Sequence, residues 1–374
     1  MPTQPDSPYT LWFDQYREEH RPRVGGKNAS LGSMLTAGLP VPPGFAVTTD
    51  AYATLRGAPE LRTTVHQQLD HLDHADTRAL SEATLVVRKL IEEVPLPGDV
   101  ERDIRVGYEA LCEHCDTDDI PVAVRSSATA EDLPEASFAG LQDTFLWVRG
   151  TEAVLEHVKR CWSSVFTDRA VAYRRQRGFE HDVINMSVGV QKMVRPQAAG
   201  VAFTLNPSDG DRSQVAIDAS WGFGEAVVSG EVTPDNYLVD KVLGEIVRRK
   251  VSPKALEYRL DGDAVEPVAV DEDRQLQPCL TDDQIRAVAR MARRAEKHYG
   301  CPQDTEWAID DDLPDGEDVI LLQSRPETVW STKPRTRVAA NGKDPISAIV
   351  DTLCSPLAAR GEPARETTAA GEPG

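Results

Sequence analysis

The pattern of apolar residues changes along this chain, and that change limits the folds open to it. Apolar positions recur at helical spacing in residues 60–112, which are rich in Leu, Val, Glu and Arg, and again in residues 152–177. Between residues 183 and 250 short apolar runs alternate with turns, which is typical of strands. We therefore expect an α+β protein with a helical N-terminal scaffold and mixed sheet lobes. The expected strands of this stretch are 187–193, 200–205, 214–219 and 237–240.

Several helix ends are marked by residue type. Residues 27–37 are predicted to form a helix that stops at Gly38, and Thr281-Asp-Asp-Gln284 is a capping box that opens a helix ending at Gly300. The helix predicted over 152–177 has a core-facing stripe of Val154, Val158, Trp162, Val165 and Phe166. Further breaks are expected at Pro95, Pro97 and Gly178, and two last strands at 306–310 and 319–324.

Composition excludes several classes of function. With 374 residues and 40% hydrophobic content, the chain can bury a sizeable core. A net charge of −20 argues against binding to a phosphate polymer or an anionic membrane, so any phosphate site has to be local. No apolar stretch approaches the roughly 20 residues that span a bilayer, and the N-terminal residues lack a secretory pattern. We expect a cytoplasmic protein.

We expect three parts: an N-terminal lobe over residues 1–200, a C-terminal lobe over 201–330, and a tail over 331–374. The tail is rich in Pro, Gly, Ala, Thr and charge, so it is expected to be mostly disordered, with residues 346–353 as a short segment able to dock.

Six scattered cysteines fit reduced thiols in a reducing compartment. Cys112 and Cys115 form a C-x-x-C pair around His114, but the sequence offers no second ligand pair for a metal. We interpret this segment as the end of a surface helix.

Two segments bring a cation to the edge of an element. Residues 122–124 read as a short buried strand that delivers Arg125 into a polar loop. Gly25 and Gly26 precede Lys27 at the start of a helix, where backbone N–H groups and an ammonium can meet phosphate oxygens. This is no Walker A loop, because Arg21 replaces its first glycine and Asn28 its Ser or Thr. Taken alone, a glycine turn with a solvated lysine remains the commoner interpretation.

The segment Trp221-Gly-Phe-Gly-Glu follows an apolar strand. A dinucleotide-binding loop would need a third glycine, and Val227 stands there. We interpret Gly222, Gly224 and Gly230 as positions where the backbone turns closely beside a ligand or another strand.

The last two expected strands carry Glu306, Gln323 and Arg325. A carboxylate and an amide oxygen suit Mg²⁺ between phosphates, and a guanidinium neutralises phosphate charge. In isolation, a surface glutamate and a structural arginine would be commoner.

Six motifs taken together resemble one family over about residues 10–330. That family is the nucleotide-binding domain of phosphoenolpyruvate synthase, pyruvate phosphate dikinase and rifampicin phosphotransferase. The motifs are Val24-Gly-Gly-Lys-Asn-Ala-Ser-Leu-Gly, Val41-Pro-Pro-Gly-Phe, Val124-Arg-Ser-Ser-Ala-Thr-Ala-Glu-Asp, Ser137-Phe-Ala-Gly-Leu-Gln-Asp-Thr, Gly222-Phe-Gly-Glu and Leu322-Gln-Ser-Arg-Pro.

The resemblance implies an ATP-grasp fold whose lobes close over ATP, and it implies a set of site residues. Lys27 and Arg125 would grip the phosphates as catalytic residues, together with Arg325 on the terminal phosphates. Glu306 and Gln323 would bind Mg²⁺. The remaining ATP-binding positions would be Gly140, Thr144 near the transferred group and Gln191 near the adenine. Phosphoryl transfer depends mainly on positioning and charge neutralisation, and these groups supply both.

The resemblance also implies a partner. In this family ATP is split to AMP, and the β-phosphoryl group passes to a histidine on a swivelling domain. A third domain then phosphorylates the substrate. None of the eight histidines here lies in the family's Thr-Ser-His type loop, and each reads as structural or solvent-facing. We expect an ATP-binding component that needs a partner chain carrying the histidine, as in split phenylphosphate synthases. The acceptor would be pyruvate, a phenol or an antibiotic hydroxyl.

Two other functions stay open at this point. One is a self-contained ATP-grasp ligase, although we find no second pocket signature for its acid and amine. The other is a non-catalytic nucleotide-binding regulatory protein, against which the retained charged set of Lys27, Arg125, Glu306 and Gln323 weighs.

Overall fold

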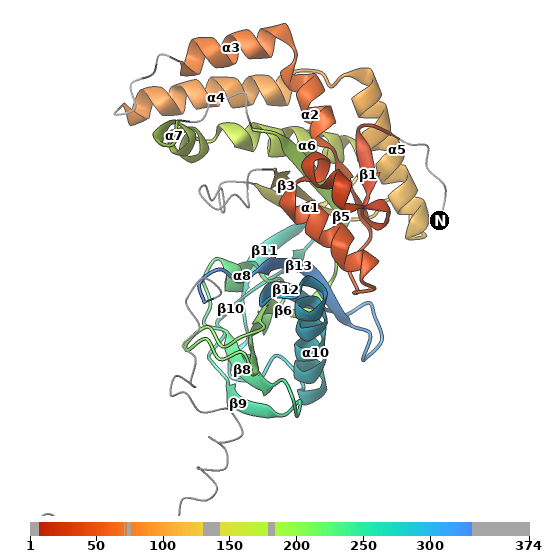
Figure 1. The fold of residues 1–374 in the computed structure, drawn as a ribbon, viewed down its shortest axis with the longest axis vertical. Helices are drawn as coiled ribbons and strands as arrows, with labels where there is room; N and C mark the ends of the chain where they lie inside the picture. Colours follow the sequence, from red (N-terminus) through yellow and green to blue (C-terminus); the bar gives the residue numbers. More distant parts are fainter. Residues whose placement is uncertain (1–6, 71, 73–75, 130–142, 179–183, 331–374) are drawn as a thin grey trace, which may run out of the picture. The chain divides into compact units, whose positions relative to one another are not determined.

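The computed structural model describes residues 7–70, 72, 76–129, 143–178 and 184–330, which all belong to one compact unit (Figure 1). The expectations for Gly140, for residues 331–374, and for His71 and His74 lie outside the described residues. Within the described ranges, no helix is both long and apolar enough to cross a membrane.

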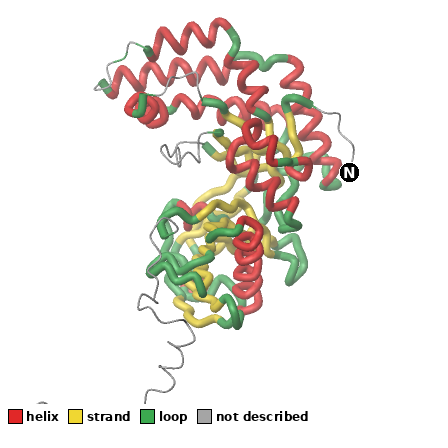
Figure 2. The backbone as a smooth tube through the Cα atoms, viewed as in Figure 1, coloured by secondary structure: helices red, strands yellow, loops and turns green. Residues whose placement is uncertain are grey.

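Two antiparallel sheets organise the described chain, as the strands in Figure 2 show. The first sheet has the order β1 (Thr10–Trp12), β2 (Gly44–Val47), β5 (Met186–Lys192), β3 (Val122–Ala128) and β4 (Thr144–Val148). The second has the order β13 (Val319–Pro326), β12 (Gln303–Asp310), β6 (Pro196–Phe203), β7 (Gln214–Trp221), β8 (Asp235–Asp240) and β9 (Ile246–Lys250). A separate hairpin joins β10 (Leu256–Asp261) to β11 (Ala264–Ala269). The mixture of helices and sheets confirms the α+β class.

Each sheet has its own apolar core. Helices α2 (Thr49–Arg56), α3 (Pro59–Leu69), α4 (Thr77–Glu93), α5 (Gly98–His114), α6 (Thr151–Ser163) and α7 (Asp168–Gln176) share one core with the first sheet. Helix α10 (Asp282–Tyr299) and helix α1 (Arg21–Thr36) share the other with the second sheet. Two short helices, α8 (Glu225–Val228) and α9 (Glu272–Gln275), follow β7 and β11. Because α1 also contacts β3 and β5, it touches both sheets.

The predicted helix ends are confirmed where local chemistry decides them. The Thr281 hydroxyl accepts from the backbone N–H of Gln284, whose side chain accepts in return from the N–H of Thr281, so the capping box is present. Gly300 ends α10 in the left-handed region, and Gly38 follows α1 in the same region with φ of 68°. The helical block of residues 60–112 is divided before α5, as the prolines predicted.

Several predicted elements differ in extent, and two of these differences have a clear physical reason. The helix expected over 152–177 is two helices, because Thr167 adopts an extended conformation and its hydroxyl caps α7 at the N–H of Ala170. The strand expected over 122–124 continues to Ala128, because β5 pairs with its whole length. Arg125 therefore lies within a strand rather than a loop.

Candidate functional site

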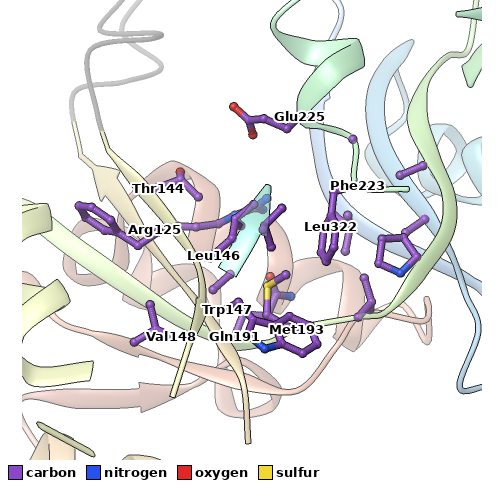
Figure 3. A pocket seen from close by; sticks show the side chains of 18 of the residues that line it. Arg125, Thr144, Leu146, Trp147, Val148, Gln191, Met193, Phe223, Glu225 and Leu322 are labelled. Atoms are coloured by element: carbon purple, nitrogen blue, oxygen red, sulfur yellow. The ribbon is translucent and has the colours of Figure 1, made fainter. Parts of the chain in front are cut away.

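A cavity of about 1440 Å³ lies against both sheets, and Figure 3 shows it from close by. It is larger than the roughly 300–1,000 Å³ of pockets that hold drug-sized ligands. Seven of the predicted site residues line it, namely Lys27, Arg125, Thr144, Gln191, Glu306, Gln323 and Arg325. Four of these come from segments before residue 195 and three from the last two strands, so the fold gathers distant motifs at one place.

Strand alternation explains the first-sheet wall of the cavity. On β3, Val122 and Val124 belong to the core, so Ala123 and Arg125 face the other way and line the cavity. Ala123 pairs across the sheet with Gln191 of β5. Gln191 is almost fully buried, and its amide donates to the Pro42 carbonyl at 3.3 Å, which holds its side chain in place.

Arg125 of the first sheet lies near Glu306 of the second sheet. Its guanidinium lies 4.0 Å from the Glu306 carboxylate, with side-chain exposures of 21% and 27%. Its Nε is buried and has no hydrogen-bond partner among the described residues. A buried donor without a partner is costly, so this group is ready to bind an acceptor. Thr144, which pairs with Arg125 across β3 and β4, is exposed to the cavity.

Lys27 reaches the site because α1 begins very close to β3. Gly25 has φ of 72° and ψ of 174°, and a Cβ placed there would lie 2.2 Å from the Ser127 carbonyl oxygen. Only glycine allows both this conformation and this approach. The next turn is held by the Ser127 hydroxyl, which accepts from the N–H of Asn28 at 3.3 Å. Lys27 Nζ consequently lies 3.4 Å from the Ser126 carbonyl oxygen, at the cavity wall.

A β-bulge arranges the residues from the second sheet. Glu306 pairs with Gln323 and Trp307 with Leu321, so Leu322 is an extra residue on β13. Leu321 belongs to the core beneath α10, whereas both Leu322 and Gln323 line the cavity. Glu306 and Gln323 are therefore direct cross-strand neighbours that share the cavity.

Arg325 lies at the rim of the cavity and already has a strong partner. Its Nε donates to the Asp304 carboxylate at 2.8 Å, and its second nitrogen lies 2.7 Å from the same oxygen. The Arg325 side chain is 60% exposed and that of Asp304 is 12% exposed. Asp304 therefore orients the guanidinium, and the sequence analysis did not identify it.

Other lining residues were also missed. Leu146, Trp147, Met193 and Phe223 form an apolar end of the cavity, and Figure 3 shows Phe223 and Leu322 across from Arg125 and Leu146. Residues 145–148 are all apolar, so their sequence does not indicate that both Leu146 and Trp147 face the cavity. Phe223 belongs to the Gly-Phe-Gly-Glu motif, which was the one available signal.

The predicted role of Gly222 is confirmed. Its φ is 69°, and a Cβ there would lie 2.1 Å from the carbonyl oxygen of Tyr258 on β10. The backbone N–H of Phe223 donates to that same oxygen at 2.8 Å. This close contact anchors the β10–β11 hairpin beside the cavity.

Asp143 is a further titratable group at the cavity. Burial raises the pKa of its carboxyl, and the Arg88 guanidinium at 3.9 Å only partly opposes that shift. The backbone carbonyl of Asp143 accepts from both the N–H and the hydroxyl of Ser126, which ties the start of β4 to β3.

The cavity residues suit a nucleotide triphosphate with its metal. Within the described ranges, no three His, Cys, Asp or Glu side chains gather as a metal cage. Mg²⁺ usually needs no such cage, because one or two carboxylates together with substrate phosphates hold it. Glu306 and the amide oxygen of Gln323 supply that kind of partial ligand set.

Comparisons with known proteins identify the family of this chain. The family model described as "Pyruvate phosphate dikinase, AMP/ATP-binding domain" matches residues 21–344. A probable phosphoenolpyruvate synthase of Staphylothermus marinus is 43% identical over 348 residues, covering 87% of this chain and 42% of that protein. One from Methanothermobacter thermautotrophicus is 46% identical over 321 residues, covering 86% and 46%. The phosphoenolpyruvate synthase of Pseudomonas aeruginosa is 41% identical over 339 residues, covering 86% and 42%.

The chain thus spans less than half the length of these relatives. A solved structure from Pyrococcus horikoshii matches 72% of this chain and 99% of that one at 12% identity, but its TM-score of 0.29 is too low to support a comparison of folds. The resemblance drawn from the six motifs is confirmed by the family model and by the relatives. The chain therefore belongs to the AMP/ATP-binding domain family of pyruvate phosphate dikinase and phosphoenolpyruvate synthase.

Proposed function

We propose that the cavity binds Mg-ATP and that the chain passes a phosphoryl group to a histidine carried by a separate domain or a partner chain. The observation that carries this proposal is the convergence of Lys27, Arg125, Glu306 and Gln323 on one cavity. Their ammonium, guanidinium, carboxylate and amide groups are those that phosphoryl transfer requires.

The cavity residues have different roles toward the phosphates, according to their positions. Lys27 and Arg125 hold the phosphates, and the unpartnered Nε of Arg125 gains an acceptor when they bind. Thr144 lies beside Arg125, near the transferred group. Arg325 contacts the terminal phosphates while Asp304 keeps its guanidinium oriented, which limits the side-chain entropy lost on binding.

Glu306 and Gln323 hold the Mg²⁺. When bound, Mg²⁺ would supply positive charge that neutralises the phosphates. The Glu306 carboxylate lies 4.0 Å from the Arg125 guanidinium, so the two groups partly compensate each other's charge.

In the transfer step the bond between the β-phosphorus and the oxygen that bridges it to the α-phosphorus breaks, AMP leaves, and the β-phosphorus forms a bond to a histidine nitrogen. The γ-phosphoryl group remains attached to the β-phosphoryl group until water takes it as inorganic phosphate. Of the described histidines, His157 alone lines the cavity. Its Nδ1 lies 2.7 Å from the Ala153 carbonyl oxygen and its ring packs against Phe145, which supports a structural role and an acceptor histidine from elsewhere.

The relatives are described as phosphoenolpyruvate synthases, which supports pyruvate as the final acceptor over a phenol or an antibiotic hydroxyl. We also propose an ATP-grasp fold, with lobes over residues 1–200 and 201–330 that close on the nucleotide. The passage from β5 to β6 at Lys192–Pro196 supports this division, because the chain leaves the first sheet and enters the second there. A cytoplasmic location belongs to the same proposal and is supported by the free thiols of the five described cysteines.

Calorimetric titration with Mg-ATP tests the proposal. Lys27→Ala and Glu306→Ala should each weaken binding by at least tenfold, since each removes a charged contact worth about 1.5–3 kcal/mol. The exposed pair Lys250→Ala and Glu317→Ala serves as the matched control and should leave the dissociation constant unchanged. AMP should form only slowly until the histidine domain of a related phosphoenolpyruvate synthase is supplied. Failure of the wild-type chain to bind Mg-ATP would refute the proposal.

A further inference from the structure

The strand β4 departs from regular pairing at the cavity. Val122 pairs with Val148 and Val124 with Phe145, so the single residue Ala123 faces both Leu146 and Trp147. This is a β-bulge, which turns side chains away from the regular alternation. Phe145 and Val148 pack on the first-sheet core, while Leu146 and Trp147 both turn to the cavity. A regular strand cannot place two consecutive side chains on one face.

The bulge carries a strained residue. Trp147 has φ of 58°, in the left-handed region that bulky side chains rarely adopt. Outliers of this kind persist where the surrounding structure holds them, and they cluster at ligand sites. Trp147 is held by Phe223, whose ring meets it edge to face with centroids 6.3 Å apart.

The surroundings of Ala123 form a slot for a flat group. Ala123 is a small floor, with Trp147 on the β4 side and Gln191 on the β5 side, and Met193 follows two residues after Gln191 on the same face. Ala123 lies two residues before Arg125 on the same face of β3, about 7 Å away. The cavity is therefore apolar and aromatic at one end and cationic at the other, which complements the aromatic base and the anionic phosphates of a nucleotide.

We propose that Trp147 is the principal base-contacting side chain of this site and that it sets the preference for a nucleotide over a bare triphosphate. The inference rests on the proposed function, since it assigns the other end of the same ligand. The bulge presents the indole beside the base above Ala123, and the edge-to-face contact with Phe223 fixes its orientation.

A purely structural role for Trp147 predicts something different. If the indole served only to hold β4 against Phe223, its loss would loosen the whole cavity and weaken every ligand alike. Comparing Mg-ATP with magnesium tripolyphosphate separates the two roles, because tripolyphosphate has the charged end of the ligand and no base.

The experiment measures dissociation constants of both probes for the wild-type chain and for Trp147→Leu, Trp147→Phe and Ala123→Leu. Base stacking on an aromatic side chain is worth enough to change affinity about 5- to 150-fold. Trp147→Leu should therefore weaken Mg-ATP by at least about fivefold and leave tripolyphosphate within about twofold. Trp147→Phe, which keeps a ring, should retain most of the ATP affinity. Trp330→Leu, whose indole donates to the Pro207 carbonyl away from the cavity, is the matched control and should change neither.

Ala123→Leu fills the floor and should weaken ATP but not tripolyphosphate, so it carries the test if Trp147→Leu does not fold. Tryptophan fluorescence adds a direct readout, since ATP should quench it more in the wild type than in Trp147→Phe, in which Trp307 is the tryptophan left at the cavity among the described residues. Equal weakening of both probes, or an unchanged ATP affinity in folded Trp147→Leu and Ala123→Leu, would overturn the inference. If the wild-type chain bound tripolyphosphate and ATP equally, the base site would be refuted while the phosphate site stood. If it bound neither, the proposed function itself would fail and this inference with it.

Discussion

Replacing Gly25 by alanine perturbs the start of α1 in two ways that the structure separates. The φ of 72° and ψ of 174° lie in a region that is essentially restricted to glycine, which costs about 1–3 kcal/mol for alanine. In addition, the new Cβ would lie 2.2 Å from the Ser127 carbonyl oxygen, whereas real contacts essentially never fall below 3.0 Å. The helix start must therefore move away from β3 by roughly 0.8 Å, which is the difference between those two distances.

That displacement moves Lys27, which is two residues further on. A charge-assisted contact between its ammonium and a phosphate is worth about 1.5–3 kcal/mol, so losing it should raise the dissociation constant of Mg-ATP about 10- to 150-fold. Stability should fall by about 2–5 kcal/mol, because overpacking adds to the backbone strain.

Gly38 is a matched control at the other end of the same helix. It has a similar φ of 68°, but no atom lies within 4 Å of the position that its Cβ would take. Gly38→Ala should therefore cost about 1–3 kcal/mol of stability and leave ATP binding unchanged. Calorimetric titration and urea unfolding of both variants provide the comparison. If Gly25→Ala bound Mg-ATP like the wild type and lost no more stability than Gly38→Ala, the reasoning from the close contact with β3 would be refuted.

Three further predictions concern stability. Lys254 and Asp235 form a fully buried ion pair at 2.6 Å, so Lys254→Met should cost about 3–5 kcal/mol in urea unfolding. Arg174 is also buried but has no acidic partner among the described residues, and burial lowers its pKa to about 10, so Arg174→Met should be neutral or stabilising. Equal losses of stability in the two variants would contradict this reasoning. The raised pKa of Asp143 means that its charged form is disfavoured in the fold, so Asp143→Asn should stabilise the chain at neutral pH. That advantage should be lost as the pH falls through the raised pKa of the folded state, and it should be gone below the ordinary carboxyl pKa of 3.8; a gain that does not depend on pH would exclude this cause. Thr281→Ala should cost about 1 kcal/mol by removing the capping box, and Thr281→Ser, which keeps the hydroxyl, should restore it.

The family and most of the candidate site residues could be predicted from the sequence because they occur in short motifs. Lys27 follows a glycine pair, Arg125 follows an apolar run, and Gln323 and Arg325 share one pentapeptide. Such motifs state which chemical groups are present and in what order. The expectation that these groups share one site came from the resemblance to a family, because spacing along the chain does not determine distance in space.

Local chemistry likewise determined where several elements end. Glycine in the left-handed region closes α1 and α10, and the side chain of Thr281 satisfies a free N–H at the first turn of α10. The division of the predicted 152–177 helix was missed because Thr167 is compatible with a helix interior by its spacing. Its extended backbone and its hydrogen bond to Ala170 decide otherwise.

The sequence by itself determined the fold class, the family and the charged groups of the site, because side-chain chemistry and short-range periodicity are carried by neighbouring residues. Only the tertiary structure decided which side chains face the cavity. Trp147 and Leu322 lie at bulges, and a bulge arises from the register between two strands, which neither strand encodes alone. The pairing of Arg325 with Asp304 depends in the same way on the register of β12 and β13.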